Sequence, residues 1–270
     1  MITERLPVRA GGLPVALAGS WAVAVRQMRN LYRQPAWIVI GLSQPVVWLL
    51  LYGALLRKIV EIPGFGSDSY LTFLTPGIVV MNAFFASGWS GMDVIDDVSR
   101  GVFDRFLITP IPRSALIVGR LIHSALSTVI QSAILIILGL ALGARFPGGV
   151  PGLLALTACA VLLGIGVGGL SSALALVLRK GQSVIAAGNF LLLPLTFLSS
   201  IFIKQDLAPG WIQALAHVNP VNWTVEAGRA ALAAPSDWVL IGERAAGLLA
   251  FALVCCALAV RALRLYQRAT

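Results

Sequence analysis

The chain has 270 residues, of which 58% are hydrophobic and only 11% are charged, and its formal net charge is +9 at pH 7. Soluble domains carry about 25% charged residues, so this composition excludes an ordinary soluble domain and favours an integral membrane protein. The basic residues are spread along the chain rather than gathered in one patch, which argues against a nucleic-acid-binding protein.

The first predicted element is an amphipathic helix at residues 21–34, which read "WAVAVRQMRNLYRQ". Helical periodicity separates its aromatic residues from its arginines, which predicts a helix lying in the membrane interface. A soluble helix packed on a partner is the alternative. Pro35 then ends the helix, because proline disfavours the helical conformation of the residue before it. The residues that define this interfacial helix are Trp21, Arg26, Arg29, Tyr32 and Arg33.

Six later segments are long and apolar enough to cross a hydrocarbon core of ~30 Å, which takes about 20 residues per helix. They are residues 37–56, 71–92, 115–142, 153–178, 183–203 and 239–262. An even number places both termini on one side. The flanks on that side carry fourteen basic and five acidic residues, and the opposite loops carry six of each. The excess of basic residues predicts that both termini are cytoplasmic. The expected organisation is therefore a cytoplasmic N-terminus (1–36), a six-span domain (37–262) and a cytoplasmic tail (263–270).

Several kinds of active site are disfavoured by what the sequence lacks. No acidic residue lies between Asp104 and Asp206, although buried carboxylates are the usual proton or sodium relays of ion-driven carriers. No P-loop motif is present, so we expect no ATP binding by this chain itself. The two histidines and three cysteines lack metal-ligand spacing. We therefore expect no cofactor, no metal site and no catalytic residue.

Polar, aromatic and small residues interrupt the apolar spans. We expect Pro45, Pro76 and Pro194 to kink or open their helices. Gly164 and Gly168 predict a face of small residues for close helix packing. The polar side chains either hydrogen-bond neighbouring helices or contact a transported molecule, and both alternatives remain open. The candidates for a substrate path are Gln44, Trp48, Asn82, Phe85, Asn189 and Phe197.

The loop at residues 204–238 predicts two short amphipathic helices, at about 207–235, that dip into the outer leaflet. Trp211, Leu215 and Val218 share one face of the first helix. Asn219-Pro220 interrupts the pattern, and the second helix is expected to start at Trp223.

A dense mixed-charge segment, "RGVFDRFLITPIPR", follows the second span at residues 100–113. Helical spacing over 98–109 gives one apolar face and one charged face, and Arg100 and Asp104 form an i,i+4 pair. Pro110 and Pro112 end the pattern. We expect a helix that docks on a cytoplasmic partner, and a simple membrane anchor is the alternative. The residues assigned to docking are Val102, Phe103, Asp104, Arg105, Phe106, Leu107, Thr109 and Pro110.

Four stretches in order, at residues 25–35, 70–85, 101–122 and 218–232, resemble the permeases of ABC-2 type exporters, close to the daunorubicin-resistance efflux permeases. The residues in the best-matching stretch that stand in the family's places are Asp104, Arg105, Thr109, Pro110, Arg113, Gly119 and Arg120. Phe106 departs from the usual leucine, but both side chains are apolar. In the outer loop, Asn219-Pro220 and Arg229 also match.

The resemblance implies an all-α fold of the type V exporter class, with six transmembrane helices after an interfacial connecting helix. It further implies a homodimer of permeases in a bacterial plasma membrane, with two separate ATPase subunits that use ATP and Mg²⁺. Residues 98–109 would be the coupling helix, and the cargo of this multidrug-efflux class would be an amphipathic drug-like or lipid-like compound moved outward.

Two other functions remain open. One is an ABC-2 permease for a polysaccharide or a lipid-linked glycoconjugate. The other is an ion-driven carrier or an integral-membrane enzyme, for which Asp93, Asp96 and Asp97 are the one acidic cluster at a membrane edge. We expect these three aspartates to begin the coupling loop or to bind arginines there.

Overall fold

The computed structural model describes residues 35–61, 69–100 and 114–268, and every regular element in these ranges is helical. The predicted interfacial helix at 21–34 lies outside the described residues. So do residues 101–113, which contain all the residues assigned to docking. Both assignments therefore stay predictions.

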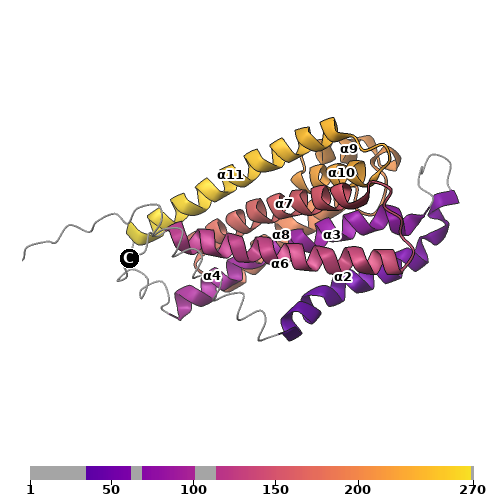
Figure 1. Cartoon of the computed structure of the whole chain (residues 1–270). Coiled ribbons are helices and arrows are strands. Elements are labelled where there is room, and N and C mark those ends of the chain that lie inside the picture. Colours follow the sequence, from indigo (N-terminus) through magenta and orange to yellow (C-terminus); the bar gives the residue numbers. More distant parts are fainter. Residues whose placement is uncertain (1–34, 62–68, 101–113, 269–270) are drawn as a thin grey trace, which may run out of the picture.

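The main helices form an elongated bundle (Figure 1). In chain order they are α2 (Pro35–Leu55), α3 (Tyr70–Gly88), α4 (Ser90–Ser99), α6 (Ser114–Ala141), α7 (Gly149–Leu178), α8 (Gly181–Phe197), α9 (Gly210–His217), α10 (Pro220–Leu232) and α11 (Trp238–Arg268). Short 3-10 turns occupy Arg57–Glu61 and Gln205–Leu207. The helices α9 and α10 lie at one end of the bundle, and α4 and the C-terminal end of α11 lie at the other.

Four stretches of the described helices are long and apolar enough to cross a membrane unaided, and two shorter apolar helices accompany them. The long stretches are Tyr70–Ser99, Leu121–Ala141, Gly149–Leu178 and Trp238–Tyr266, and the shorter ones are Ile40–Leu55 and Gly181–Phe197. All six fall on predicted spans. The all-helical, multi-span character of the chain is thus confirmed, whereas the count of six complete crossings stays a prediction.

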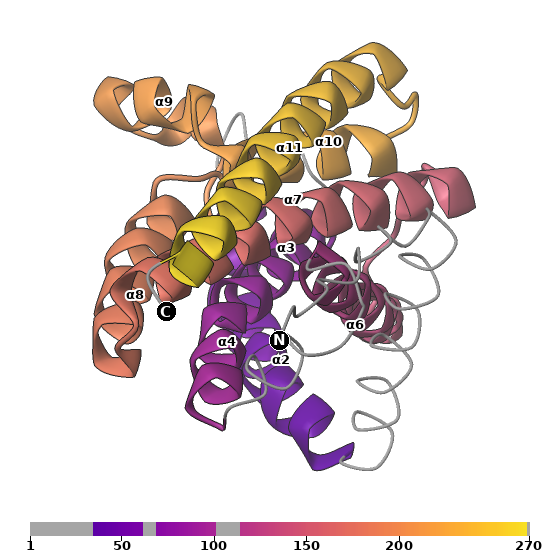
Figure 2. The same cartoon turned by 90° about the vertical axis from the view of Figure 1, so that its left-hand side faces the viewer.

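Helix α7 is the centre of the bundle, and it packs against α3, α4, α6, α10 and α11 (Figure 2). The predicted small-residue face at Gly164 and Gly168 is confirmed, because a Cβ on Gly164 would lie 2.8 Å from the hydroxyl of Ser87. On another side of α7, a Cβ on Gly166 would lie 2.6 Å from the ring of Phe251 in α11. The glycines of this helix therefore allow close approach of two neighbours at once.

The predicted second span is two helices rather than one. Helix α3 ends at Gly88 and α4 begins at Ser90, with Trp89 between them. Pro76 lies inside α3, so the break does not fall at the proline. Ser90 to Ser99 form a short amphipathic helix, in which Asp96 makes a long, exposed ion pair of 4.0 Å with Arg100.

The fifth predicted span is shortened by contacts from the outer loop. It was expected to reach residue 203, but α8 ends at Phe197. The side-chain amide of Asn219 donates hydrogen bonds to the carbonyl oxygens of Leu195 (2.7 Å) and Leu198 (3.1 Å). Carbonyl groups near a helix C-terminus have no partner within their own helix, so Asn219 stabilises the end of α8 at this position.

The same asparagine starts α10. Its side-chain oxygen accepts a hydrogen bond of 2.9 Å from the backbone N–H of Val221, and Pro220 occupies the first turn, where a missing N–H costs nothing. The expected start at Trp223 is therefore wrong by three residues, because the cap begins the helix earlier.

The two outer helices differ in their surroundings. Trp211, Leu215 and Val218 form an exposed apolar face on and just after α9, as predicted. In contrast, α10 packs against α3, α7 and α11, and most of its residues are buried. Contact with the outer leaflet stays a prediction for α9, whereas α10 is mainly part of the bundle's interior.

Candidate functional site

Helices α2 and α8 both pack against α3. When the bundle is viewed end-on, α3 and α4 lie between α2 and α8 (Figure 2). We call the surface formed by α2, α3 and α8 the α2–α8 face. The six candidate path residues come from these three helices: Gln44, Trp48, Asn82, Phe85, Asn189 and Phe197.

Four aromatic residues form a cluster at one end of this face. The rings of Trp48 and Tyr52 stack with centroids 4.9 Å apart, and Phe202 lies 5.4 Å from Trp48 and 5.1 Å from Tyr52. Phe197 joins the cluster at 6.4 Å from Phe202. Aromatic pairs at these separations attract one another beyond simple burial. The cluster links α2 to the segment that follows α8.

Sequence reasoning missed two members of this cluster. Tyr52 lies one turn after Trp48 in α2, so helical spacing could have found it. Phe202 could not have been found in this way, because it lies beyond the end of α8 and reaches α2 only through the tertiary fold.

Asn82 does not lie on the α2–α8 face. It is buried, and its side-chain amide donates a hydrogen bond of 2.7 Å to the side-chain oxygen of Gln131 in α6. One turn later, the hydroxyls of Ser87 and Ser124 lie 3.3 Å apart. For Asn82 the structure therefore shows an interhelical hydrogen bond, the first of the two alternatives.

The remaining candidates stay near the surface. Gln44 in α2 and Asn189 in α8 are exposed, and Phe197 is exposed on α8. Phe85 is half-buried on α3. Its ring centroid lies 6.0 Å from that of Phe84, and the two rings are nearly perpendicular. The structure thus brings Trp48 and Phe197 into one cluster through Phe202, and it leaves Gln44 and Asn189 as separate polar groups.

The α2–α8 face is otherwise strongly apolar. Its exposed large apolar residues are Ile40, Val47, Leu50, Leu51 and Leu55 on α2, and Ile185, Phe190, Leu191, Leu193 and Phe197 on α8. Exposed apolar side chains in this number require lipid or protein against them. A compound that meets this face encounters aromatic and aliphatic side chains with isolated amides between them.

A buried arginine of α10 contacts α3 and the segment that follows α8. The guanidinium carbon of Arg229 is 3.5 Å from the centroid of the Phe73 ring, and Nη2 donates to the carbonyl oxygen of Ile201 at 3.1 Å. Burial lowers the pKa of Arg229 to about 9, and Coulombic interactions with Tyr70 and then Glu226 act in the opposite direction. The guanidinium therefore stays charged at neutral pH.

A polar network links the segment that follows α8 to α10 and α11. Asn222 in α10 is fully buried, and its side-chain oxygen accepts hydrogen bonds from both the backbone N–H and the hydroxyl of Ser200. Its amide donates to Glu226 at 2.8 Å, and Glu226 forms an ion pair with Arg244 of α11, also at 2.8 Å. Local sequence patterns contain no signal for this pairing of three separate segments.

No candidate metal centre emerges from residues 35–61, 69–100 and 114–268, since no three or more His, Cys, Asp or Glu side chains gather there. All three cysteines are free thiols.

A helical bundle with several membrane-length apolar helices defines a multi-pass membrane protein. The sequence pattern of the ABC-2 type transporter matches residues 19–233. The chain therefore belongs to the ABC-2 type transporter family, as its motifs indicated, and it is a permease of that family.

Relatives with assigned names agree with this membership. The chain is 30% identical over 226 residues to the daunorubicin resistance ABC transporter permease protein DrrB1 of Streptomyces coeruleorubidus, covering 83% of this chain and 76% of the relative. It is 32% identical over 198 residues to the putative transport permease ycf38 of Cyanophora paradoxa, covering 73% and 68%. It is 24% identical over 226 residues to the probable doxorubicin resistance ABC transporter permease protein DrrC of Mycobacterium tuberculosis, covering 83% and 80%.

Proposed function

We propose that this chain is the permease subunit of an ATP-driven exporter that moves amphipathic drug-like or lipid-like compounds outward across a bacterial plasma membrane. The observation that carries the proposal is the α2–α8 face, where the aromatic cluster adjoins exposed aliphatic residues and two exposed amides. Such a surface suits a ligand with a flat apolar body and few polar groups. Two relatives named for daunorubicin and doxorubicin resistance support the same class of cargo.

Membership of the ABC-2 family implies an ABC ATPase partner. In the proposed assembly, two copies of this chain face each other through their α2–α8 faces, and two ATPase subunits bind at the cytoplasmic end. ATP and Mg²⁺ are used by the partner, so this chain supplies no catalytic residue. Residues 98–109 act as the coupling helix, and residues 21–34 act as the connecting helix at the membrane surface.

Reconstituted transport tests this function. Proteoliposomes that contain the chain and its ATPase are expected to move daunorubicin when ATP and Mg²⁺ are supplied, without any proton gradient. Trp48→Ala, which removes the largest ring of the aromatic cluster, should lower transport but leave the ATPase bound. Trp211→Ala on α9 is the matched control, since Trp211 is also exposed but belongs to another part of the surface.

Two results would contradict the proposal. Transport driven by an imposed ion gradient, with no ATPase present, would show an ion-driven carrier. ATP-dependent transport of a lipid-linked glycan, with no movement of daunorubicin, would place the chain among the glycoconjugate permeases.

A further inference from the structure

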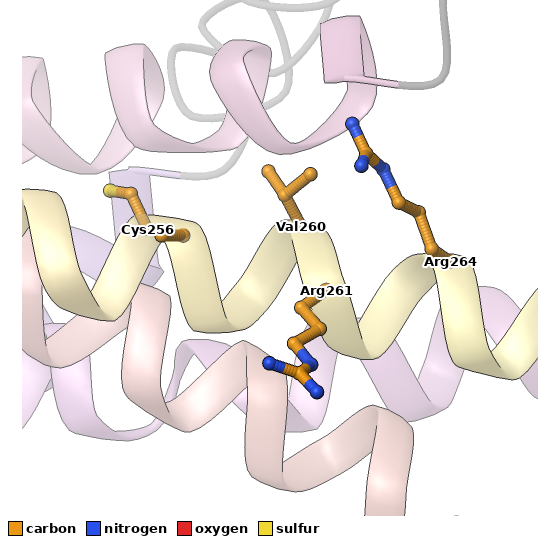
Figure 3. Close-up of a pocket in the computed structure, with 5 residues that line it drawn as sticks. Cys256, Val260, Arg261 and Arg264 are labelled. Atoms are coloured by element: carbon orange, nitrogen blue, oxygen red, sulfur yellow. The ribbon is translucent and has the colours of Figure 1, made fainter.

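The C-terminal half of α11 borders an open groove of about 560 Å³. Its described lining residues are Cys256, Ala257, Val260, Arg261 and Arg264. Figure 3 shows the side chains of Cys256, Val260 and Arg264 on one side of α11 and that of Arg261 on the opposite side. The groove therefore has an apolar wall that ends in two basic side chains.

The position of the groove along α11 matches the edge of a bilayer. A helix rises 1.5 Å per residue, so a hydrocarbon core of ~30 Å takes about 20 residues from Trp238. This distance ends near Leu258, which places Val260 at the edge of the acyl region and Arg261 at the level of the headgroups. The end of α7 lies at a similar level, because Arg179 stacks 4.7 Å over the ring of Tyr266.

The two arginines of the groove lack an anionic partner in the part of the chain that the structure describes. Both are exposed. The ion pairs found there are those of Arg100 with Asp96, Lys204 with Asp206 and Arg244 with Glu226. Arg261 and Arg264 lie about one helical turn apart in sequence at the edge of an apolar groove, and exposed guanidinium groups on long side chains are suited to bind the phosphate of a headgroup.

We propose that this groove binds one anionic phospholipid. Its phosphate lies at the basic end of the groove, which Arg261 and Arg264 line, and an acyl chain lies along Cys256, Ala257 and Val260. A lipid fits better than a soluble phosphate, since helical spacing continues the apolar wall to Leu253, which is exposed on the same helix. The site lies on α11, away from the α2–α8 face, and it does not depend on which compound is transported.

Native mass spectrometry of the purified chain in detergent tests the site with defined lipids. The wild type should retain phosphatidylglycerol in preference to phosphatidylcholine. The double variant R261Q/R264Q should bind phosphatidylglycerol at least about tenfold more weakly, because each basic residue near a headgroup contributes roughly fivefold. The matched control is R57Q/R145Q, which removes the same charge from exposed residues outside the groove and should bind like the wild type.

A second variant separates the apolar wall from the charges. Val260→Trp fills the groove but keeps both arginines, and it should also reduce retention of phosphatidylglycerol. Inorganic phosphate should not displace the lipid at equal concentration. Gel filtration shows whether R261Q/R264Q folds. If it does not, R261K/R264K and Val260→Trp test the site instead. The lysine variant should retain the lipid, and the tryptophan variant should lose it.

Three outcomes would overturn the site. Retention by R261Q/R264Q equal to that of the wild type would remove the role of the arginines. Full retention of phosphatidylglycerol by Val260→Trp would show that the groove is not needed and that surface charge alone binds the lipid. Displacement by inorganic phosphate would show an anion site without lipid recognition.

Discussion

The hydroxyl of Ser171 in α7 accepts a hydrogen bond of 3.0 Å from the backbone N–H of Gly91 in α4. The same hydroxyl donates to the carbonyl oxygen of Gly88, the last residue of α3, at 2.5 Å. The break at Trp89 removes these two backbone groups from the regular helical pattern, since the N–H of Met92 bonds to Trp89 instead of Gly88. One serine therefore satisfies both groups and allows the span to break inside the bundle.

Ser171→Ala is expected to destabilise the protein by about 1–3 kcal/mol, because two buried backbone groups lose their partner. Thermal unfolding in detergent measures the effect. Thr157→Val is the matched control in the same helix, since its hydroxyl bonds only to Leu153 of its own helix. A melting temperature of Ser171→Ala equal to that of the wild type would show that the break does not need the serine.

Asn82 and Gln131 form a partly buried hydrogen-bonded pair, so their mutations should not be additive. Asn82→Leu alone leaves the side-chain oxygen of Gln131 without its donor and is expected to lower stability by about 1 kcal/mol. The double variant N82L/Q131L should lose less than the sum of the two single variants. A double-mutant cycle on unfolding free energies measures this coupling. Additive losses would mean that the hydrogen bond contributes nothing, and would return Asn82 to the set of path candidates.

Arg229 should not tolerate a change to lysine. Lysine keeps the charge but loses the flat guanidinium that stacks on Phe73 and donates to Ile201. The expected loss of stability is about 1–3 kcal/mol. Arg244→Lys is the control, since its ion pair with Glu226 is partly exposed and should cost less. Equal melting temperatures of Arg229→Lys and the wild type would contradict a structural role for the guanidinium.

Phe106 lies outside the described residues, and its predicted role rests on the amphipathic pattern of residues 98–109. If it anchors the coupling helix in the ATPase, Phe106→Ala should weaken ATPase binding by ~2 kcal/mol or more. Phe106→Trp should also weaken it, because overpacking a filled socket costs ~1–3 kcal/mol. Co-purification in detergent measures both variants without a bilayer. Equal ATPase binding by the wild type and both variants would remove Phe106 from the interface.

Single-cysteine labelling tests the topology. After Cys159, Cys255 and Cys256 are replaced by alanine, Asp237→Cys is expected to react with an impermeant reagent in intact cells. Gln267→Cys, at the other end of α11, should react only after the membrane is opened. The reverse pattern would place the termini outside.

The sequence alone determined the class of this protein and much of its local structure. Apolar length fixed where the membrane helices lie, because a helix must satisfy its own backbone groups in lipid. The small residues Gly164 and Gly168 indicated where α7 meets its neighbours. Asn219-Pro220 separated α9 from α10, because capping and proline chemistry act within a few residues.

Only the tertiary structure decided where helices break and which polar groups meet. Ser171 lies 80 residues from Gly91, Asn219 lies 24 residues from Leu195, and Gln131 lies 49 residues from Asn82. In each case a side chain from a distant segment satisfies a polar group that would be costly to leave unpaired in an apolar interior. Local periodicity contains no information about such partners, so the break at Trp89, the end of α8 and the enclosed position of Asn82 follow from the packing of the bundle.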